Sequence, residues 1–177
     1  RSSDPMMDEF NEKELTKSYK DRAEHIMIVD LERNDLGRIC EYGSVRPSEF
    51  IKLEKYSTVF HLVSTVSGRL KNDIDAIDCL LAAFPGGSIT GAPKIRSMEI
   101  IEELEPVKRG IYTGALGYIS FDGDMDLSIV IRTILIRDKK LYFHVGGGIV
   151  SDSDPASEYA ETLDKAKGMM QALGVIS

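Results

Sequence analysis

The sequence predicts an α+β fold with antiparallel strands, and three observations support this class. The expected elements follow one another as helix, strand, two helices, three strands and helix, without the regular alternation of βαβ units. Tight turns at 122–124 and 137–139 join consecutive strands, which favours antiparallel pairing. Of the 177 residues, 42% are hydrophobic, which is enough for one core, so we expect a single domain over 1–177.

The first half of the chain is predicted to be mainly helical. We expect residues 1–10 to be a frayed end, and Gly37 to follow the end of the first helix. Pro93 suits the first turn of a later helix, because its missing N–H group would have no partner there. The expected elements are a helix over 11–33, a strand over 56–66 and helices over 74–83 and 95–104.

The second half is predicted to contain three strands and a last helix. The glycines at 146–148 interrupt the apolar alternation after the third strand, and the segment 152–155 has the residue types that cap a helix. Gly174 is a typical C-terminal stop. The expected elements are strands over 114–121, 125–136 and 141–145 and a helix over 155–173.

Charge and composition exclude several classes of function. The chain has 22 basic and 29 acidic residues, and the resulting formal charge of -7 disfavours binding to nucleic acid or to an acidic membrane. No apolar run approaches the ~20 residues that cross a bilayer. Cys40 and Cys79 stand far apart without metal spacing, so we expect reduced thiols and a cytoplasmic protein.

Acidic residues at helical spacing form the first candidate site. Glu158 and Glu161 are three residues apart and Lys165 follows four later, so all three project from one side of the last helix. A solvated helix face is the usual explanation of such a pattern. The alternative is a Mg²⁺ site, which would need a further carboxylate, and Asp21 and Glu24 on the first helix have the same spacing.

The glycine-rich segment 84–94 is a candidate anion site but not a nucleotide-binding P-loop. A P-loop has its lysine directly after the second glycine, whereas Ala92 and Pro93 separate Gly91 from Lys94. Its hydroxyl-bearing Ser88 and the start of the following helix could receive a carboxylate. A tight turn with a helix cap explains the segment equally well.

Three further side chains are candidates for binding or catalysis. Arg132 lies in the apolar run 128–136, where it either reaches solvent from an edge strand or clamps a carboxylate. Tyr112 and the backbone N–H groups of 146–148 suit the same anion. His61 has apolar neighbours, which is more often the pattern of a core histidine than of a catalyst.

Several long motifs, taken together, carry a resemblance to a known family. They are 24–35 (EHIMIVDLERND), 61–64 (HLVS), 84–94 (FPGGSITGAPK), 131–133 (IRT) and 146–162 (GGGIVSDSDPASEYAET). In this order they resemble the chorismate-utilising enzymes, which include anthranilate synthase component I and aminodeoxychorismate synthase component I. The resemblance covers nearly everything from 20 to 173. It implies the C-terminal portion of a chorismate-binding fold, in which two antiparallel sheets form a sandwich with helices outside.

The resemblance also implies roles for individual residues. The implied Mg²⁺ ligands, direct or through water, are Glu24, Glu158 and Glu161, with Asp21 nearby. The residues implied to bind the carboxylates of chorismate are Tyr112, Arg132, Gly147, Gly148 and Lys165. Ser88 is implied to contact the ring, and His61 is the implied active-site histidine.

The implied reaction is the Mg²⁺-dependent amination of chorismate to 4-amino-4-deoxychorismate, in the para-aminobenzoate and folate branch. The segment 84–94 resembles the enzymes of this branch more than it resembles anthranilate synthase. A glutamine amidotransferase partner would supply the ammonia. An anthranilate synthase fragment is the alternative. Because the chain begins at Arg1 and lacks the family's lysine motif, we expect a C-terminal fragment of a longer enzyme. A second alternative is therefore a catalytically silent piece that binds Mg²⁺ and chorismate or self-associates through exposed sheet edges.

Overall fold

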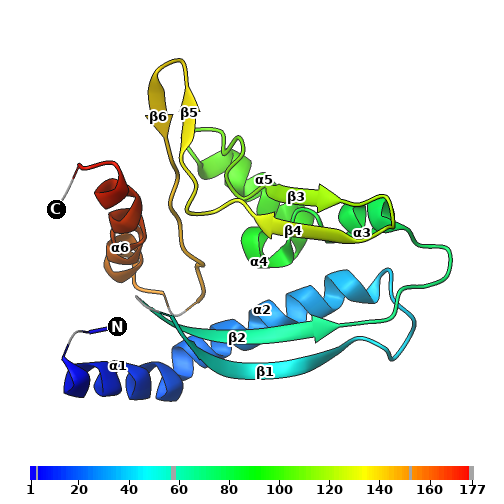
Figure 1. The fold of residues 1–177 in the computed structure, drawn as a ribbon, viewed down its shortest axis with the longest axis horizontal. Helices are drawn as coiled ribbons and strands as arrows, with labels where there is room; N and C mark the ends of the chain where they lie inside the picture. Colours follow the sequence, from blue (N-terminus) through cyan, green and yellow to red (C-terminus); the bar gives the residue numbers. More distant parts are fainter. Residues whose placement is uncertain (3, 57–58, 152, 176–177) are drawn as a thin grey trace. The chain divides into compact units, whose positions relative to one another are not determined.

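The computed structural model describes residues 1–2, 4–56, 59–151 and 153–175 (Figure 1). The chain divides into two compact units, Arg1–Ser97 and Met98–Ser177. Each unit combines helices with antiparallel strands, which confirms the predicted α+β class. The single domain over 1–177 stays a prediction. No helix among the described residues is both long enough and apolar enough to cross a membrane.

Two helices open the first unit where the sequence predicted a frayed end and one helix. Helix α1 (Pro5–Lys17) begins after Asp4, whose carboxylate accepts the N–H group of Met6 at 3.0 Å. Ser18 then interrupts the helical backbone with ψ 116° and caps helix α2 (Tyr19–Gly37) by accepting the Asp21 N–H at 3.2 Å. The expected fraying of 1–10 is therefore wrong, because Asp4 and Pro5 form a regular helix start.

A long antiparallel hairpin packs against α2 in the first unit. Strand β1 (Arg46–Lys55) pairs with β2 (Phe60–Ser67) from Arg46↔Ser67 to Lys55↔Phe60. The sequence predicted only the second strand, because the charged residues of β1 do not give a clear apolar alternation. Among the described residues of this unit, the buried apolar side chains are Val29, Ile39 and Cys40.

Three short helices complete the first unit and lead into the second. Helix α3 (Ala76–Ala83) has the capping box that Asp75 and Asp78 form, and a single helical turn, α4 (Gly87–Thr90), follows it. Helix α5 (Lys94–Leu104) begins directly after Pro93 and crosses the boundary between the units. The helices expected over 74–83 and 95–104 are thus confirmed, and both α3 and α4 contact α2.

The second unit consists of two hairpins and a final helix. Strands β3 (Ala115–Ile119) and β4 (Met125–Ile129) pair antiparallel, as do β5 (Leu135–Arg137) and β6 (Lys140–Tyr142). The turn of the second hairpin has positive φ at Asp138 (51°) and Lys139 (61°), which suits a tight two-residue connection. Helix α6 (Pro155–Ala172) begins after Asp154, as the sequence predicted, although Asp152 lies outside the described residues.

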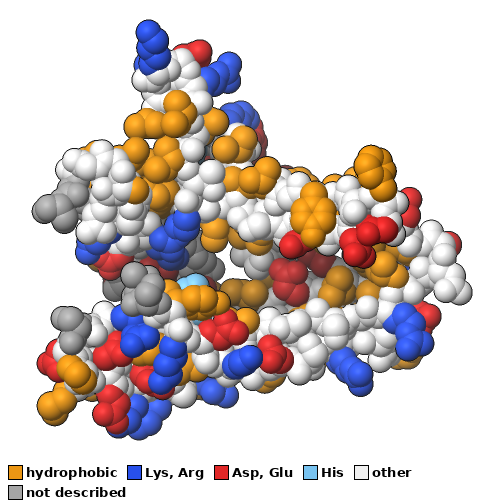
Figure 2. Space-filling view, viewed as in Figure 1, with side chains coloured by type: hydrophobic (Ala, Val, Ile, Leu, Met, Phe, Trp, Pro, Cys, Tyr) orange, Lys and Arg blue, Asp and Glu red, His pale blue; other side chains and the backbone are white. Residues whose placement is uncertain are grey.

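The predicted strand over 125–136 is wrong in its middle. Residues 131–134 leave the sheet, and Arg132 adopts φ 53°, which an extended strand does not contain. Strands β4 and β5 therefore belong to separate two-stranded sheets within the described part of the chain. Both hairpins expose apolar side chains (Figure 2), including Leu116 on β3 and Ile136 on β5. Such exposed faces are typical of surfaces that another segment or partner covers.

Candidate active site

Three charged side chains of α6 converge on one glycine in the second unit. A Cβ atom added to Gly147 would lie 3.5 Å from Glu158 Oε2, 3.5 Å from Lys165 Nζ and 3.8 Å from Glu161 Oε1. Two carboxylates and one ammonium group thus meet beside the backbone of Gly147, which has no side chain of its own. The prediction that Glu158, Glu161 and Lys165 share one face of the helix is confirmed, and this face meets the glycine loop 146–148.

The start of α6 positions the first of these carboxylates. Asp154 accepts the N–H group of Ser157 at 2.8 Å, which fixes the first helical turn, and Glu158 lies in that turn. Glu158 is only 7% exposed, and its Oε1 accepts a hydrogen bond of 2.6 Å from the hydroxyl of Ser153. The positive end of the helix dipole favours a negative group there. The interpretation of this face as merely solvated is therefore wrong for Glu158.

Lys165 joins the helix to the glycine loop. Its ammonium group pairs with Glu161 and donates a hydrogen bond of 3.2 Å to the carbonyl of Gly146. Arg132 reaches the same helix, since its Nη1 donates to the carbonyl oxygen of Lys165 at 2.7 Å. The guanidinium is exposed, although it extends from a loop and not from the edge strand that the first alternative required.

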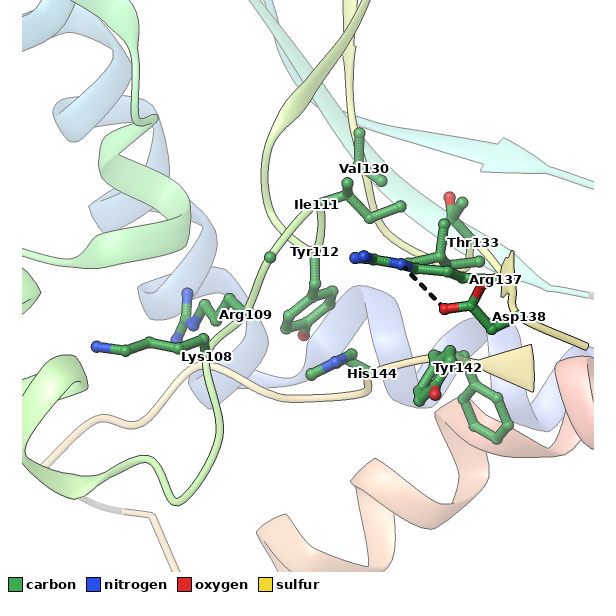
Figure 3. Close-up of a pocket in the computed structure, with 13 residues that line it drawn as sticks. Lys108, Arg109, Ile111, Tyr112, Val130, Thr133, Arg137, Asp138, Tyr142 and His144 are labelled. Atoms are coloured by element: carbon green, nitrogen blue, oxygen red, sulfur yellow. Dashed lines mark ion pairs between the residues drawn. The ribbon is translucent and has the colours of Figure 1, made fainter. Parts of the chain in front are cut away.

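The Tyr112 ring lies between two other side chains (Figure 3). It stacks on His144 with ring centroids 5.3 Å apart at 19°, and the Arg109 guanidinium lies 5.8 Å from its centroid. Its hydroxyl borders the glycine loop, because a Cβ atom on Gly146 would lie 2.9 Å from it. The structure thus brings Tyr112 to the loop where Lys165 and Glu158 also meet.

Arg109 is itself held by a carboxylate. Its Nε and Nη2 donate to the two oxygens of Glu105 at 2.9 and 2.6 Å. The hydrogen bond from Arg109 lowers the pKa of Glu105 below its usual value. Sequence reasoning missed Arg109, Glu105 and His144, and the four-residue spacing of the first two was the signal that could have found them.

A cavity of about 350 Å³ lies beside the Tyr112 ring. Figure 3 shows that it is lined by basic, aromatic and apolar side chains of the second unit. Its cations have acidic partners, because Lys108 pairs with Glu102 and Arg137 with Asp138. The cavity therefore offers a mixed wall and no cluster of uncompensated positive charge.

The three candidate residues of the first unit stand on separate elements: Glu24 on α2, His61 on β2 and Ser88 on α4. His61 is exposed and meets the ring of Tyr56 edge-on, at 5.6 Å and 73°. The alternative of a buried core histidine is therefore wrong. His61 lies opposite Glu54 across the β1–β2 ladder.

His25, which follows Glu24, makes a contact between two elements of the first unit. Its Nε2 lies 2.7 Å from the hydroxyl of Ser64 on β2, and burial lowers its pKa. The same hydroxyl accepts the N–H group of Ile51 at 2.8 Å. His25 therefore fastens α2 to the hairpin.

The donor set suits a hard cation, although the described residues do not complete a metal site. Within them, no three His, Cys, Asp or Glu side chains gather closely enough to hold a metal ion. Glu158 and Glu161 nevertheless turn carboxylate oxygens to one glycine, and oxygen is the ligand that Mg²⁺ prefers. Glu24, the third carboxylate implied by the resemblance, lies in the other unit.

Comparison with known proteins identifies the family. The model of the family described as chorismate binding enzyme matches residues 1–171. The chain is 54% identical over 94% of its length to aminodeoxychorismate synthase component 1 of Bacillus subtilis, covering 35% of that protein. It is 52% identical over 93% of its length to anthranilate synthase component 1 of Aquifex aeolicus, covering 33% of that protein.

A solved structure agrees with the fold. Anthranilate synthase component I from Streptococcus pneumoniae superimposes with a TM-score of 0.84 at 48% identity, over 93% of this chain and 38% of that one. The chain spans about a third of the length of the curated relatives it matches. On the extent of the family match and these identities, the chain belongs to the chorismate-binding enzyme family.

Proposed function

We propose that this chain carries the Mg²⁺- and carboxylate-binding part of an active site that aminates chorismate to 4-amino-4-deoxychorismate. The identity of 54% with the Bacillus subtilis aminodeoxychorismate synthase component 1 supports this reaction. The proposed metal ligands are Glu24, Glu158 and Glu161. The proposed substrate-binding residues are Ser88, Tyr112, Arg132, Gly147, Gly148 and Lys165, and His61 is the proposed catalytic histidine.

One observation carries the proposal: Glu158, Glu161 and Lys165 converge on Gly147. Chorismate is a dicarboxylate, so its site must present positive charge and N–H donors to one carboxylate and a cation to the other. The ammonium of Lys165 and the backbone of the glycine loop supply the first requirement. The two glutamates supply oxygen ligands for a cation at the second.

The chain's own residues would bind and orient the substrate. The guanidinium of Arg132 can grip a carboxylate through two N–H groups, and Tyr112 can donate its hydroxyl proton in a hydrogen bond to the same group. When bound, Mg²⁺ supplies positive charge at the ring carboxylate and so favours departure of the 4-hydroxyl group. Holding chorismate at fixed points on a rigid helix and loop lowers the entropic cost of the reaction.

A second candidate reaction is that of anthranilate synthase, supported by the identity of 52% with the Aquifex aeolicus component 1. Both named relatives are component 1 of a synthase. We therefore also propose a glutamine amidotransferase partner that supplies ammonia. The non-enzymatic alternative, a chain that binds Mg²⁺ and chorismate without turnover, shares the same binding residues.

Calorimetric titration of the 177-residue chain with chorismate, with and without Mg²⁺, tests the site itself. We expect binding that requires Mg²⁺ and disappears in Glu161→Ala, whose side chain is exposed and whose loss leaves the fold intact. The matched control is Asp164→Ala, which removes another exposed carboxylate from α6. Chorismate binding by Glu161→Ala equal to that of the wild type would remove the metal assignment.

Segment exchange tests catalysis. In the Bacillus subtilis relative, the matching segment is replaced by this chain, and products from chorismate and ammonia are identified by mass. Formation of 4-amino-4-deoxychorismate supports the proposed reaction. The same exchange in the Aquifex aeolicus relative examines the anthranilate alternative. Inactivity of both exchanged proteins, with normal folding, favours the silent binding chain.

A further inference from the structure

A buried carboxylate outside the proposed site ties together two elements that carry proposed site residues. We propose that Asp35 is a positioning residue, which holds the segment of the substrate-contacting Ser88 against helix α2 through the backbone of Gly87. This inference rests on the proposed function and adds to it a residue that touches neither substrate nor metal.

Asp35 is enclosed by partners from two further elements. It is 4% exposed, near the end of α2. Its Oδ2 accepts the N–H group of Gly87 at 3.2 Å, and its Oδ1 accepts a hydrogen bond from the ammonium of Lys94 at 2.8 Å. One carboxylate therefore fastens the first residues of α4 and α5 to α2, and Lys94 compensates its charge inside the unit.

Gly87 permits this approach because it lacks a side chain. A Cβ atom there would lie 3.0 Å from Cβ of Leu31 and 3.4 Å from Asp35 Oδ2, so a larger residue would push α4 away from α2. Gly87 is itself buried. The glycine-rich segment is thus neither a phosphate loop nor a merely flexible turn: its backbone is fixed one residue before Ser88.

The link matters for function because of what lies on each side of it. Helix α2 carries Glu24, a proposed metal ligand, and α4 carries Ser88, the proposed ring contact. A helix and a one-turn segment joined by a buried hydrogen bond keep a fixed separation, and a displacement of about 1 Å in such a support costs substrate affinity or rate. Lys94 also acquires a role that the sequence left open.

The test compares three replacements of Asp35 in the full chain, by calorimetric titration with chorismate at saturating Mg²⁺. Asp35→Ala removes both links, and we expect chorismate affinity to fall by about tenfold or more. Asp35→Asn keeps an oxygen that accepts the Gly87 N–H, so we expect affinity within about threefold of the wild type. Asp35→Glu keeps the charge that pairs with Lys94 but is one methylene too long for the space beside Gly87, so we expect it to bind weakly while remaining folded.

Two controls separate positioning from general stability. Asp30→Ala removes an exposed carboxylate from the same helix, where Asp30 pairs with Arg33, and should leave affinity unchanged. In a Ser88→Ala background, Asp35→Asn and Asp35→Glu should bind chorismate equally, because the contact that Asp35 positions is already lost. Thermal midpoints of all variants are measured in parallel.

The outcomes distinguish this inference from the proposed function. Absence of Mg²⁺-dependent chorismate binding by the wild type overturns the proposed function and the inference with it. Binding by the wild type that Asp35→Glu retains, or affinities that follow only the thermal midpoints across the three variants, overturns the inference alone. Rescue by Asp35→Asn despite a lowered thermal midpoint supports it.

Discussion

Among the described residues, each of the two units buries one acidic side chain, and the surroundings of the two carboxylates differ. Asp35 in the first unit is 4% exposed and bonds to Lys94 and to a backbone N–H group. Glu158 in the second unit is 7% exposed and accepts a hydrogen bond from the hydroxyl of Ser153. Its other oxygen lies beside Gly147, together with the charged groups of Glu161 and Lys165.

The difference separates a carboxylate that is paired within the fold from one that we propose to bind a ligand. Burying a charge is costly unless it is paired, and in the first unit the pairing ammonium comes from within the fold. In the second unit, the neighbouring charges of Glu161 and Lys165 gather at a glycine, where an external ion can reach them. Burial of a carboxylate alone therefore does not identify a site; the accessibility of its neighbours does.

The largest effect that this comparison predicts is on Mg²⁺ binding. Glu158→Gln removes a charged ligand while keeping its size and its contact with Ser153, so Mg²⁺ affinity should fall by about a hundredfold. Asp35→Asn, the equivalent change in the first unit, should leave Mg²⁺ affinity within about twofold of the wild type. Isothermal titration with MgCl₂ measures both.

A matched control for Glu158→Gln is Asp164→Asn, which removes an exposed charge from the same helix. If both α6 variants weaken Mg²⁺ binding equally, the general negative field of the helix, and not the site at Gly147, attracts the ion. If Asp35→Asn weakens it as much as Glu158→Gln, the distinction between the two buried carboxylates is wrong.

A smaller effect is expected at the Tyr112 ring. His144→Ala removes the ring that stacks on Tyr112 and should weaken chorismate binding by about fivefold, whereas His144→Phe keeps the stack and should bind as the wild type does. Titration of chorismate into the three proteins decides this. Equal weakening by Ala and Phe would show that the imidazole acts through its nitrogen atoms and not by supporting the ring.

Regular elements with strong local signals could be predicted from the sequence. Asp154 and Pro155 mark the start of α6, and the spacing of Glu158, Glu161 and Lys165 places them on one face. The turn at 137–139 marks a hairpin that the structure contains. In these cases the information lies within a few residues, so periodicity and capping rules suffice.

Features that depend on tertiary contacts could not be predicted. The bonds of Asp35 to Gly87 and Lys94 join residues more than 50 positions apart, and nothing in the local pattern of either segment announces them. At the break of the expected strand, Arg132 likewise contacts a residue 33 positions away, Lys165 on α6. The roles proposed for Tyr112 and Lys165 come from the family resemblance, because spacing alone left them open.

The smallest predicted effect is on the pH dependence of thermal stability. The ion pair of Glu105 with Arg109, which lies beside Tyr112, should contribute more to this dependence than an exposed ion pair of the first unit. The hydrogen bond from Arg109 lowers the pKa of Glu105 below its usual value, so the ionised carboxylate stabilises the folded state at neutral pH, and this contribution disappears as the pH falls through the lowered pKa. The thermal midpoint of Glu105→Gln should therefore lie below that of the wild type at neutral pH, and the gap should close as the solution is acidified.

The comparison variant is Glu9→Gln, which breaks the fully exposed pair with Lys13 at the same four-residue spacing in α1. Lys13 also lowers the pKa of Glu9, but solvent screens this exposed pair, so the midpoint of Glu9→Gln should stay closer to that of the wild type at every pH. Circular dichroism melts from neutral to acidic pH measure the thermal midpoints of both variants.

Because Arg109 also lies over the Tyr112 ring, chorismate affinity should fall in Glu105→Gln and not in Glu9→Gln. A pH-independent gap between Glu105→Gln and the wild type would mean that packing of the glutamate stem, and not its charge, supports Arg109.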